Sequence, residues 1–132
     1  ILAKTLHQLH HVLRSSRRDP SIRSAVESSV QQMRNAVRAV AHAESQESLM
    51  GHEGVAARGY FAALPTLVSD VAGDALRPEG RTRRPPRDRF NALLSFGYGL
   101  LARDIHSAIL RVGLDPAFGF LHQPRSAALP LV

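Results

Sequence analysis

The chain has 132 residues, 44% of them hydrophobic, and a formal net charge of +6 at pH 7. This is the length of one domain, and the hydrophobic content predicts a folded protein rather than a disordered tail. The sequence contains no cysteine, which excludes disulfides, thiolate metal sites and cysteine nucleophiles and is typical of a reducing compartment.

The positive charge comes from sixteen arginines and a single lysine. Arginine presents a planar fork of donors suited to phosphate, so a polyanionic partner is favoured, although coding composition alone can also raise arginine content. No apolar run approaches the roughly 18 residues that span a bilayer, and no signal peptide is recognisable. We expect a soluble, cytoplasmic protein that does not contact a membrane.

The first predicted helix covers residues 1 to 16, with an apolar face formed by leucines at three- and four-residue spacing. Because the chain begins at Ile1 in the middle of this pattern, we expect that an upstream part is missing. His7, His10 and His11 have a spacing that could chelate a transition metal, but without a nearby carboxylate an ordinary helix surface is favoured.

Two further helices are predicted before residue 69. Asp19 and Pro20 form a cap and first-turn signal for a helix that ends near His42, and the short connection predicts an antiparallel hairpin with the first helix. Ser45 can cap the next helix, which continues to about Val68.

Glu53 lies in this third helix among small residues. Three nearby positions carry no side chain, because they are glycines: Gly51, Gly54 and Gly59. A metal or phosphate site requires such small neighbours, since bulky ones would block a substrate. Taken alone the signal is weak, since a solvated surface glutamate is the commoner case.

The helical pattern breaks between residues 69 and 89, where four residues, Pro78, Gly80, Pro85 and Pro86, forbid a continuous helix. Residues 77–89 hold six arginines against two carboxylates, a local charge of +4. This basic loop is either a phosphate-contacting segment or a solvated linker.

A long apolar helix is predicted from a cap at Asp88 to a stop at Gly113, with a thin polar side. Its broad apolar surface predicts a central, buried helix in an all-α domain. Gly97 and Gly99 are expected to let another helix or a ligand approach the backbone, or to allow a slight bend. Tyr98 lies on the apolar ladder and is expected to be buried, unlike Asn91 and His106.

Beyond Gly113 the sequence predicts a short helix or turn, followed by an extended piece with His122 at the end of an apolar run. A lone histidine there is more often structural than a ligand or base. Residues 126–132 are apolar and stop without a terminating signal.

Several linked motifs resemble those of the CRISPR-associated spacer-acquisition integrase. The resemblance rests on the run from Arg83 to Leu101 with its Pro-Pro-Arg-Asp-Arg-Phe-Asn core, on residues 113–116 and 119–122, and on residues 49–61. Ala3-Lys4 followed by His7-Gln8 loosely echoes a lysine-containing helix start in that family. The match covers nearly the whole chain.

The resemblance implies an α-helical catalytic domain, 1–132, truncated at both ends and lacking a β-rich N-terminal domain that forms the usual homodimer contact. It implies that the 3′-hydroxyl of a captured DNA fragment attacks a phosphodiester of a CRISPR repeat. Glu53 and His122 would hold Mg²⁺ or Mn²⁺, and a small ferredoxin-like subunit would bridge two integrase dimers in a prokaryotic cell.

One departure concerns the remaining metal-binding carboxylate of the family, because no Asp or Glu follows His122. We expect that carboxylate just beyond Val132; if it is lacking, a non-catalytic DNA-binding or scaffolding subunit is the alternative. The predicted DNA contacts are Arg58, Arg81, Arg83, Arg84, Arg87, Arg89, Asn91 and Tyr98.

Overall fold

The computed structural model describes residues 1–68, 72–121 and 129–132. It contains four α-helices, α1 (Leu2–Ser15), α2 (Pro20–Val40), α3 (Gln46–Leu67) and α4 (Arg89–Arg111), and the short 3-10 helix η2 (Asp74–Leu76). No β-strand occurs in these described residues, so the all-α prediction is confirmed. No helix in the described part of the chain combines the length and apolar character needed to cross a membrane.

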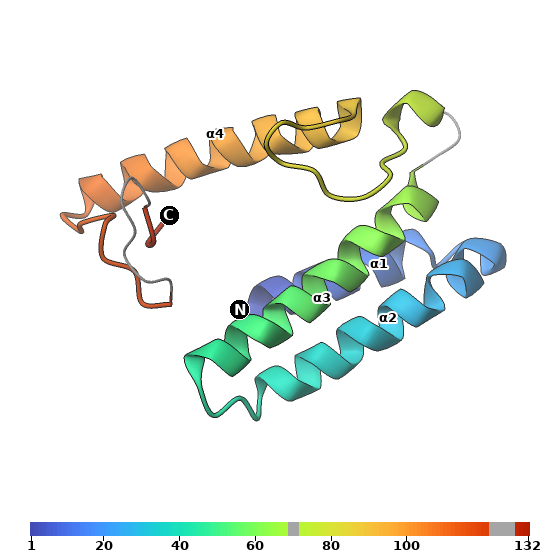
Figure 1. Ribbon diagram of the computed structural model, residues 1–132, viewed down its shortest axis with the longest axis horizontal. Helices are drawn as coiled ribbons and strands as arrows, with labels where there is room; N and C mark the ends of the chain where they lie inside the picture. The colour runs from blue at the N-terminus through green and yellow to red at the C-terminus, as the bar shows by residue number, and fades with distance from the viewer. Residues whose placement is uncertain (69–71, 122–128) are drawn as a thin grey trace.

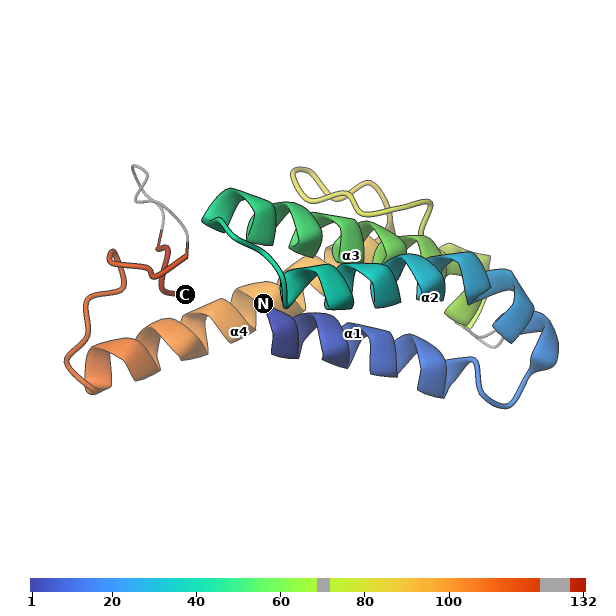
Figure 2. The same cartoon turned by 90° about the horizontal axis from the view of Figure 1, so that it is seen from below.

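Helices α1, α2 and α3 form a bundle in which each packs against the other two; α1 lies behind α3 in Figure 1 and is seen beside α2 in Figure 2. Each begins and ends within two residues of its predicted bounds. The Asp19 side chain accepts a 2.8 Å hydrogen bond from Ser21 N, and Ser45 Oγ accepts one of 3.1 Å from Ser48 N, so both predicted N-caps are confirmed. The core of the bundle contains Leu9, Val12, Val26, Val30, Met33 and Ala63.

Gly59 allows α3 to approach α2 closely. A Cβ atom at this position would lie 3.0 Å from Met33 Cγ and 3.1 Å from the Ser29 carbonyl oxygen. At Gly51 and Gly54 a Cβ atom would meet nothing within 4 Å. The three glycines of α3 therefore differ: Gly59 serves helix packing, and the other two border open space.

The prediction that the long apolar helix is central and buried is wrong for the described part of the chain. Figure 1 shows α4 set apart from the bundle, and among described elements it packs only against η2. Only Asn91 and Ile109 of its residues are buried, whereas Phe96 is 64% exposed. The apolar core is completed by α1, α2 and α3, and periodicity cannot show whether an apolar face has a partner in the same chain.

A shallow apolar groove of about 330 Å³ runs along the N-terminal half of α4. Its lining residues are Phe90, Leu93, Leu94, Gly97, Tyr98 and Leu101. Within the described residues nothing approaches Gly97 or Gly99 closely enough to explain the missing side chains.

The predicted ends of α4 are confirmed, because Asp88 caps its start and Gly113 has a positive φ of 77°. After Gly113 the described chain forms turns rather than a helix.

The predicted division of three α4 residues by burial is also wrong. Tyr98 is 46% exposed, Asn91 is fully buried, and His106 is partly buried. Tyr98 is exposed because the face of α4 that carries it has no helix against it. Asn91 is buried because the basic loop folds over it through polar contacts, which a search for apolar periodicity does not register.

Candidate functional site

Glu53 faces α1 from the N-terminal half of α3. One carboxylate oxygen, Oε1, lies 2.5 Å from the ammonium nitrogen of Lys4, and the Glu53 side chain is only 19% exposed. The Lys4 side chain is 55% exposed, so the ion pair lies at the edge of the bundle. Positions 51 and 54 of α3 border open space, whereas the Glu53 carboxylate itself faces α1.

Lys4 is a partner of Glu53 that the sequence analysis assigned no role. Two features of the sequence could have pointed to Lys4: it is the single lysine of the chain, and it lies in a motif that loosely resembles the integrase family. Spacing along the sequence could not pair the two residues, because they are 49 positions apart and meet only when α1 packs on α3.

A second contact repeats this register between α1 and α3. His11 and Tyr60 are also 49 positions apart, and Tyr60 Oη lies 3.3 Å from His11 Nδ1. Because both contacts keep the same offset, α1 and α3 run parallel along this seam. Burial raises the pKa of Tyr60 above its ordinary value.

The predicted second metal ligand, His122, lies outside the described residues. The preceding residue is described, and its carbonyl oxygen, Leu121 O, accepts a hydrogen bond from Gln46 Nε2. Gln46 is the first residue of α3, two helical turns before Glu53, or about 10 Å along the axis. The described C-terminal segment therefore approaches the helix that carries the predicted acidic ligand.

The donor chemistry of Glu53 suits a hard divalent cation, because Mg²⁺ and Mn²⁺ prefer carboxylate oxygens. No group of three metal-binding side chains occurs in the part of the chain that the structure describes. The three histidines of α1, residues 7, 10 and 11, are exposed, as expected for an ordinary helix surface. Of the two predicted ligands, the described residues thus include Glu53 alone, and its carboxylate is paired with Lys4.

Asn91 organises the basic loop from the first turn of α4. Its Oδ1 accepts hydrogen bonds from Arg81 Nη1 at 2.9 Å and Thr82 N at 3.1 Å. Its Nδ2 donates to the Gly80 carbonyl at 2.7 Å and to Asp88 Oδ2 at 2.6 Å. The amide is completely buried, and all four of its hydrogen-bonding positions are used.

Arg81 connects this loop to two helices. Its guanidinium carbon lies 5.9 Å from the ring centre of Phe61 on α3 and 6.0 Å from that of Tyr98 on α4. The same group donates to Ser95 Oγ at 3.2 Å and to Asn91. Two residues predicted to contact DNA, Arg81 and Asn91, are therefore engaged with the protein itself.

The other predicted arginines of the loop are available to solvent. Phe61, which Arg81 contacts at the base of the loop, is eight residues after Glu53 on α3, a rise of about 12 Å along the helix axis. Arg58, between these two positions, is also exposed. The exposed loop arginines are Arg83, Arg84, Arg87 and Arg89.

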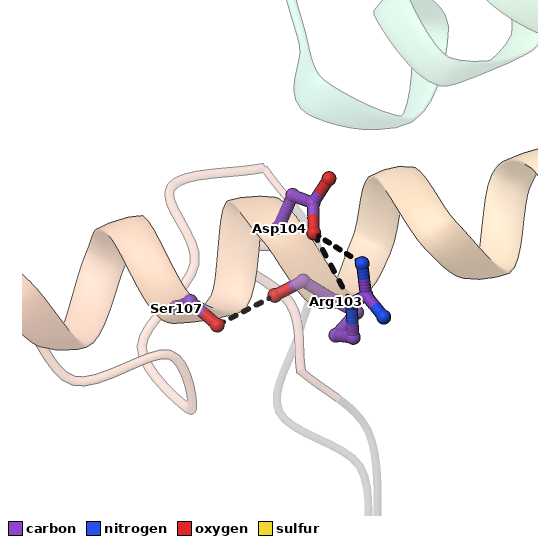
Figure 3. A network of polar contacts seen from close by, with 3 residues as sticks. All are labelled: Arg103, Asp104 and Ser107. Atoms are coloured by element: carbon purple, nitrogen blue, oxygen red, sulfur yellow. Dashed lines mark hydrogen bonds and ion pairs between the residues drawn. The ribbon is translucent and has the colours of Figure 1, made fainter.

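Further along α4, the arginine on its polar side is paired locally. Arg103 Nη2 lies 3.0 Å from Asp104 Oδ1, and Ser107 Oγ donates a 3.0 Å hydrogen bond to the Arg103 carbonyl oxygen, as Figure 3 shows. Both members of the ion pair are about two-thirds exposed, so the pair contributes little to stability. Exposed arginines are denser at the basic loop, where four of them lie within seven residues, than here.

The fold is similar to that of a solved CAS1 protein from Thermotoga maritima. The TM-score is 0.71 and the identity 29%, over 98% of this chain and 38% of that protein. The helical arrangement is therefore that of part of a CAS1 structure. The family model described as CRISPR associated protein Cas1 matches residues 1–132, and the chain belongs to the Cas1 family.

The relatives by sequence agree with this assignment. A Cas4 exonuclease/Cas1 endonuclease fusion from Myxococcus xanthus is 49% identical over 131 residues, which are 99% of this chain and 23% of the relative. A CRISPR-associated endonuclease Cas1 from Chlorobaculum tepidum is 48% identical over 89 residues, 67% of this chain and 26% of the relative. The chain thus spans about a quarter of the length of the curated relatives it matches.

Proposed function

We propose that this chain is the catalytic part of a divalent-metal-dependent DNA endonuclease and integrase that inserts new spacers into a CRISPR array. The proposal is supported by one observation above all: the helix that carries the largely buried Glu53 carboxylate also contacts, through Phe61, the base of an arginine loop. The relatives that are named endonucleases support the class of reaction.

In this proposal Glu53 and His122 hold Mg²⁺ or Mn²⁺, and a third carboxylate lies beyond Val132. The bound ion would offset the negative charge that develops on the phosphodiester. The Glu53 carboxylate is paired with the Lys4 ammonium group at 2.5 Å, so the metal ion would have to replace Lys4 or bind through the second carboxylate oxygen. Until then Lys4 holds the carboxylate in one orientation.

In this proposal the exposed arginines bind and position the DNA. Phosphate contacts position a duplex without reading its sequence, and an arginine-rich loop with no base-reading context suits that task. The substrates, a captured fragment and a CRISPR repeat, belong to the proposal for the full-length protein, as do the homodimer and the small ferredoxin-like partner subunit.

The test is cleavage and strand transfer by the full-length protein in Mn²⁺. Glu53→Gln removes one charge without changing the side-chain shape and should abolish both reactions while DNA affinity stays near that of the parent. The matched control is Glu47→Gln, an exposed carboxylate in the first turn of the same helix, which should retain activity. Near-parental strand transfer by Glu53→Gln contradicts the proposed metal site.

The alternative is a non-catalytic DNA-binding or scaffolding subunit. The Lys4 contact favours it, because a carboxylate paired with an ammonium group across two helices is also a common structural ion pair. In that case Lys4→Met and Glu53→Gln would lower stability by similar amounts, and the parent itself would show no Mn²⁺-dependent cleavage.

A further inference from the structure

The basic loop is closed at its base and open at its tip. Thr82 Oγ1 accepts a 3.0 Å hydrogen bond from Arg87 N, and Asp88 caps α4 by accepting from Asn91 N at 2.7 Å. These contacts draw residues 80–82 and 87–88 together around the Asn91 amide. Residues 83–86 remain as an exposed tip.

We infer that Asn91 is a positioning residue for DNA binding, which holds the loop in the shape that presents its arginines to phosphate groups. This inference rests on the proposed function, because it takes the loop to be a DNA contact. It assigns Asn91 and Arg81 to the support of the loop, and phosphate contact to Arg83, Arg84, Arg87 and Arg89.

The side chain at position 91 must donate on one face and accept on the other. The donors Arg81 Nη1 and Thr82 N meet Oδ1, and the acceptors Gly80 O and Asp88 Oδ2 meet Nδ2. An aspartate would set a second carboxylate oxygen against both acceptors, and an alanine would leave four polar groups without their partner. Asparagine satisfies both faces at once.

Arg81 reinforces this arrangement rather than contributing to phosphate contact. Its guanidinium is shared between the Asn91 and Ser95 oxygens and the rings of Phe61 and Tyr98. Binding a phosphate would require it to leave these contacts. The loop therefore keeps Arg81 for its own structure and exposes Arg83, Arg84, Arg87 and Arg89.

A loop that is already folded loses less conformational freedom when it binds. Each long side chain that must be ordered on binding weakens the affinity. If the loop is loosened by loss of the Asn91 contacts, several arginines must be ordered when DNA binds, and the Kd should rise by about tenfold. Because Asn91 touches no phosphate in this scheme, its effect must pass through the loop arginines. It should disappear when they are absent.

The experiment is a double-mutant cycle on duplex DNA binding with the full-length protein. Asn91→Ala is measured in the parent and in the triple variant Arg83→Ala, Arg84→Ala, Arg87→Ala. Asn35→Ala, an exposed asparagine on α2, is the matched control. Hydrogen exchange of residues 82–87 is measured in the DNA-free parent and in Asn91→Ala.

The expected result is a Kd about ten times higher for Asn91→Ala in the parent, a change under about twofold in the triple variant, and faster exchange in residues 82–87. An equal loss in both backgrounds overturns the inference, since Asn91 would then act independently of the arginines. An unchanged Kd for Asn91→Ala, together with weak binding by the triple variant, also overturns the inference. In that case the loop is still a DNA contact, as the proposed function requires. An unchanged Kd for the triple variant removes the DNA contact itself.

Thr82→Val provides a milder variant if Asn91→Ala does not fold. It is nearly isosteric and removes only the hydrogen bond that Arg87 N donates to Thr82 Oγ1. It should weaken DNA binding about threefold in the parent and leave the triple variant unaffected. Equal effects in the two backgrounds again count against the positioning role.

Discussion

Gly59 and Gly54 lie five residues apart on α3, and replacing each by alanine should change stability in opposite directions. Both substitutions gain helix propensity of about 1 kcal/mol. At Gly54 the new methyl group meets nothing within 4 Å, so that gain should be retained. At Gly59 the methyl group would lie 3.0 Å from Met33 Cγ and 3.1 Å from the Ser29 carbonyl oxygen.

Neither neighbour of Gly59 can move easily. Met33 is completely buried, and the Ser29 oxygen belongs to the backbone of α2. Overpacking of this kind costs about 1–3 kcal/mol, so Gly59→Ala should be less stable than Gly54→Ala by about that amount. Urea denaturation followed by circular dichroism measures both free energies of unfolding. If Gly59→Ala is as stable as Gly54→Ala, the close approach of α2 and α3 at this point is wrong.

Three further outcomes are expected. Removing Arg83, Arg84 and Arg87 should flatten the slope of log affinity against log salt by up to about 3 units on duplex DNA, and an unchanged slope in a filter-binding series would indicate a linker. Tyr98→Ala should cost about 1–2 kcal/mol in a thermal melt, less than a buried ring, because the side chain is 46% exposed. Hydrogen bonds from Ser21 lower the pKa of Asp19. The stabilising effect of its carboxylate is therefore present above about pH 4 and is lost as the pH falls through the lowered pKa. Asp19→Asn keeps a cap that does not titrate, so this variant should lose less stability in acid than the parent.

Local signals in the sequence were sufficient for the bundle. The caps at Asp19, Ser45 and Asp88 each act within three residues along the chain, so their outcome does not depend on the tertiary structure. The leucine and valine stripes of α1 and α2 face each other, as their spacing predicted. The role of Glu53 as a metal ligand stays a prediction, because its side chain is only 19% exposed and is paired with Lys4.

Contacts between distant segments could not be predicted in the same way. The pairing of Lys4 with Glu53 depends on the packing of α1 against α3, which fixes a 49-residue offset that no local pattern contains. Asn91 resembled a solvent-exposed polar residue because apolar periodicity says nothing about a loop that folds back over a helix start. The apolar face of α4 was assigned to the core because hydrophobic spacing reports an affinity for apolar surroundings and not which segment provides them.

The separation of α4 from the bundle also determines how the molecule should open. Cooperative units of unfolding follow shared buried contacts, and α4 with its loop has few in common with α1, α2 and α3. The backbone amides of α4 should therefore exchange with deuterium through a local opening that leaves the bundle intact, at a lower free energy than the amides around Met33. Arg81, which lies between the rings of Phe61 on α3 and Tyr98 on α4, is one of the contacts that join the two units, and its loss should lower the free energy of this local opening.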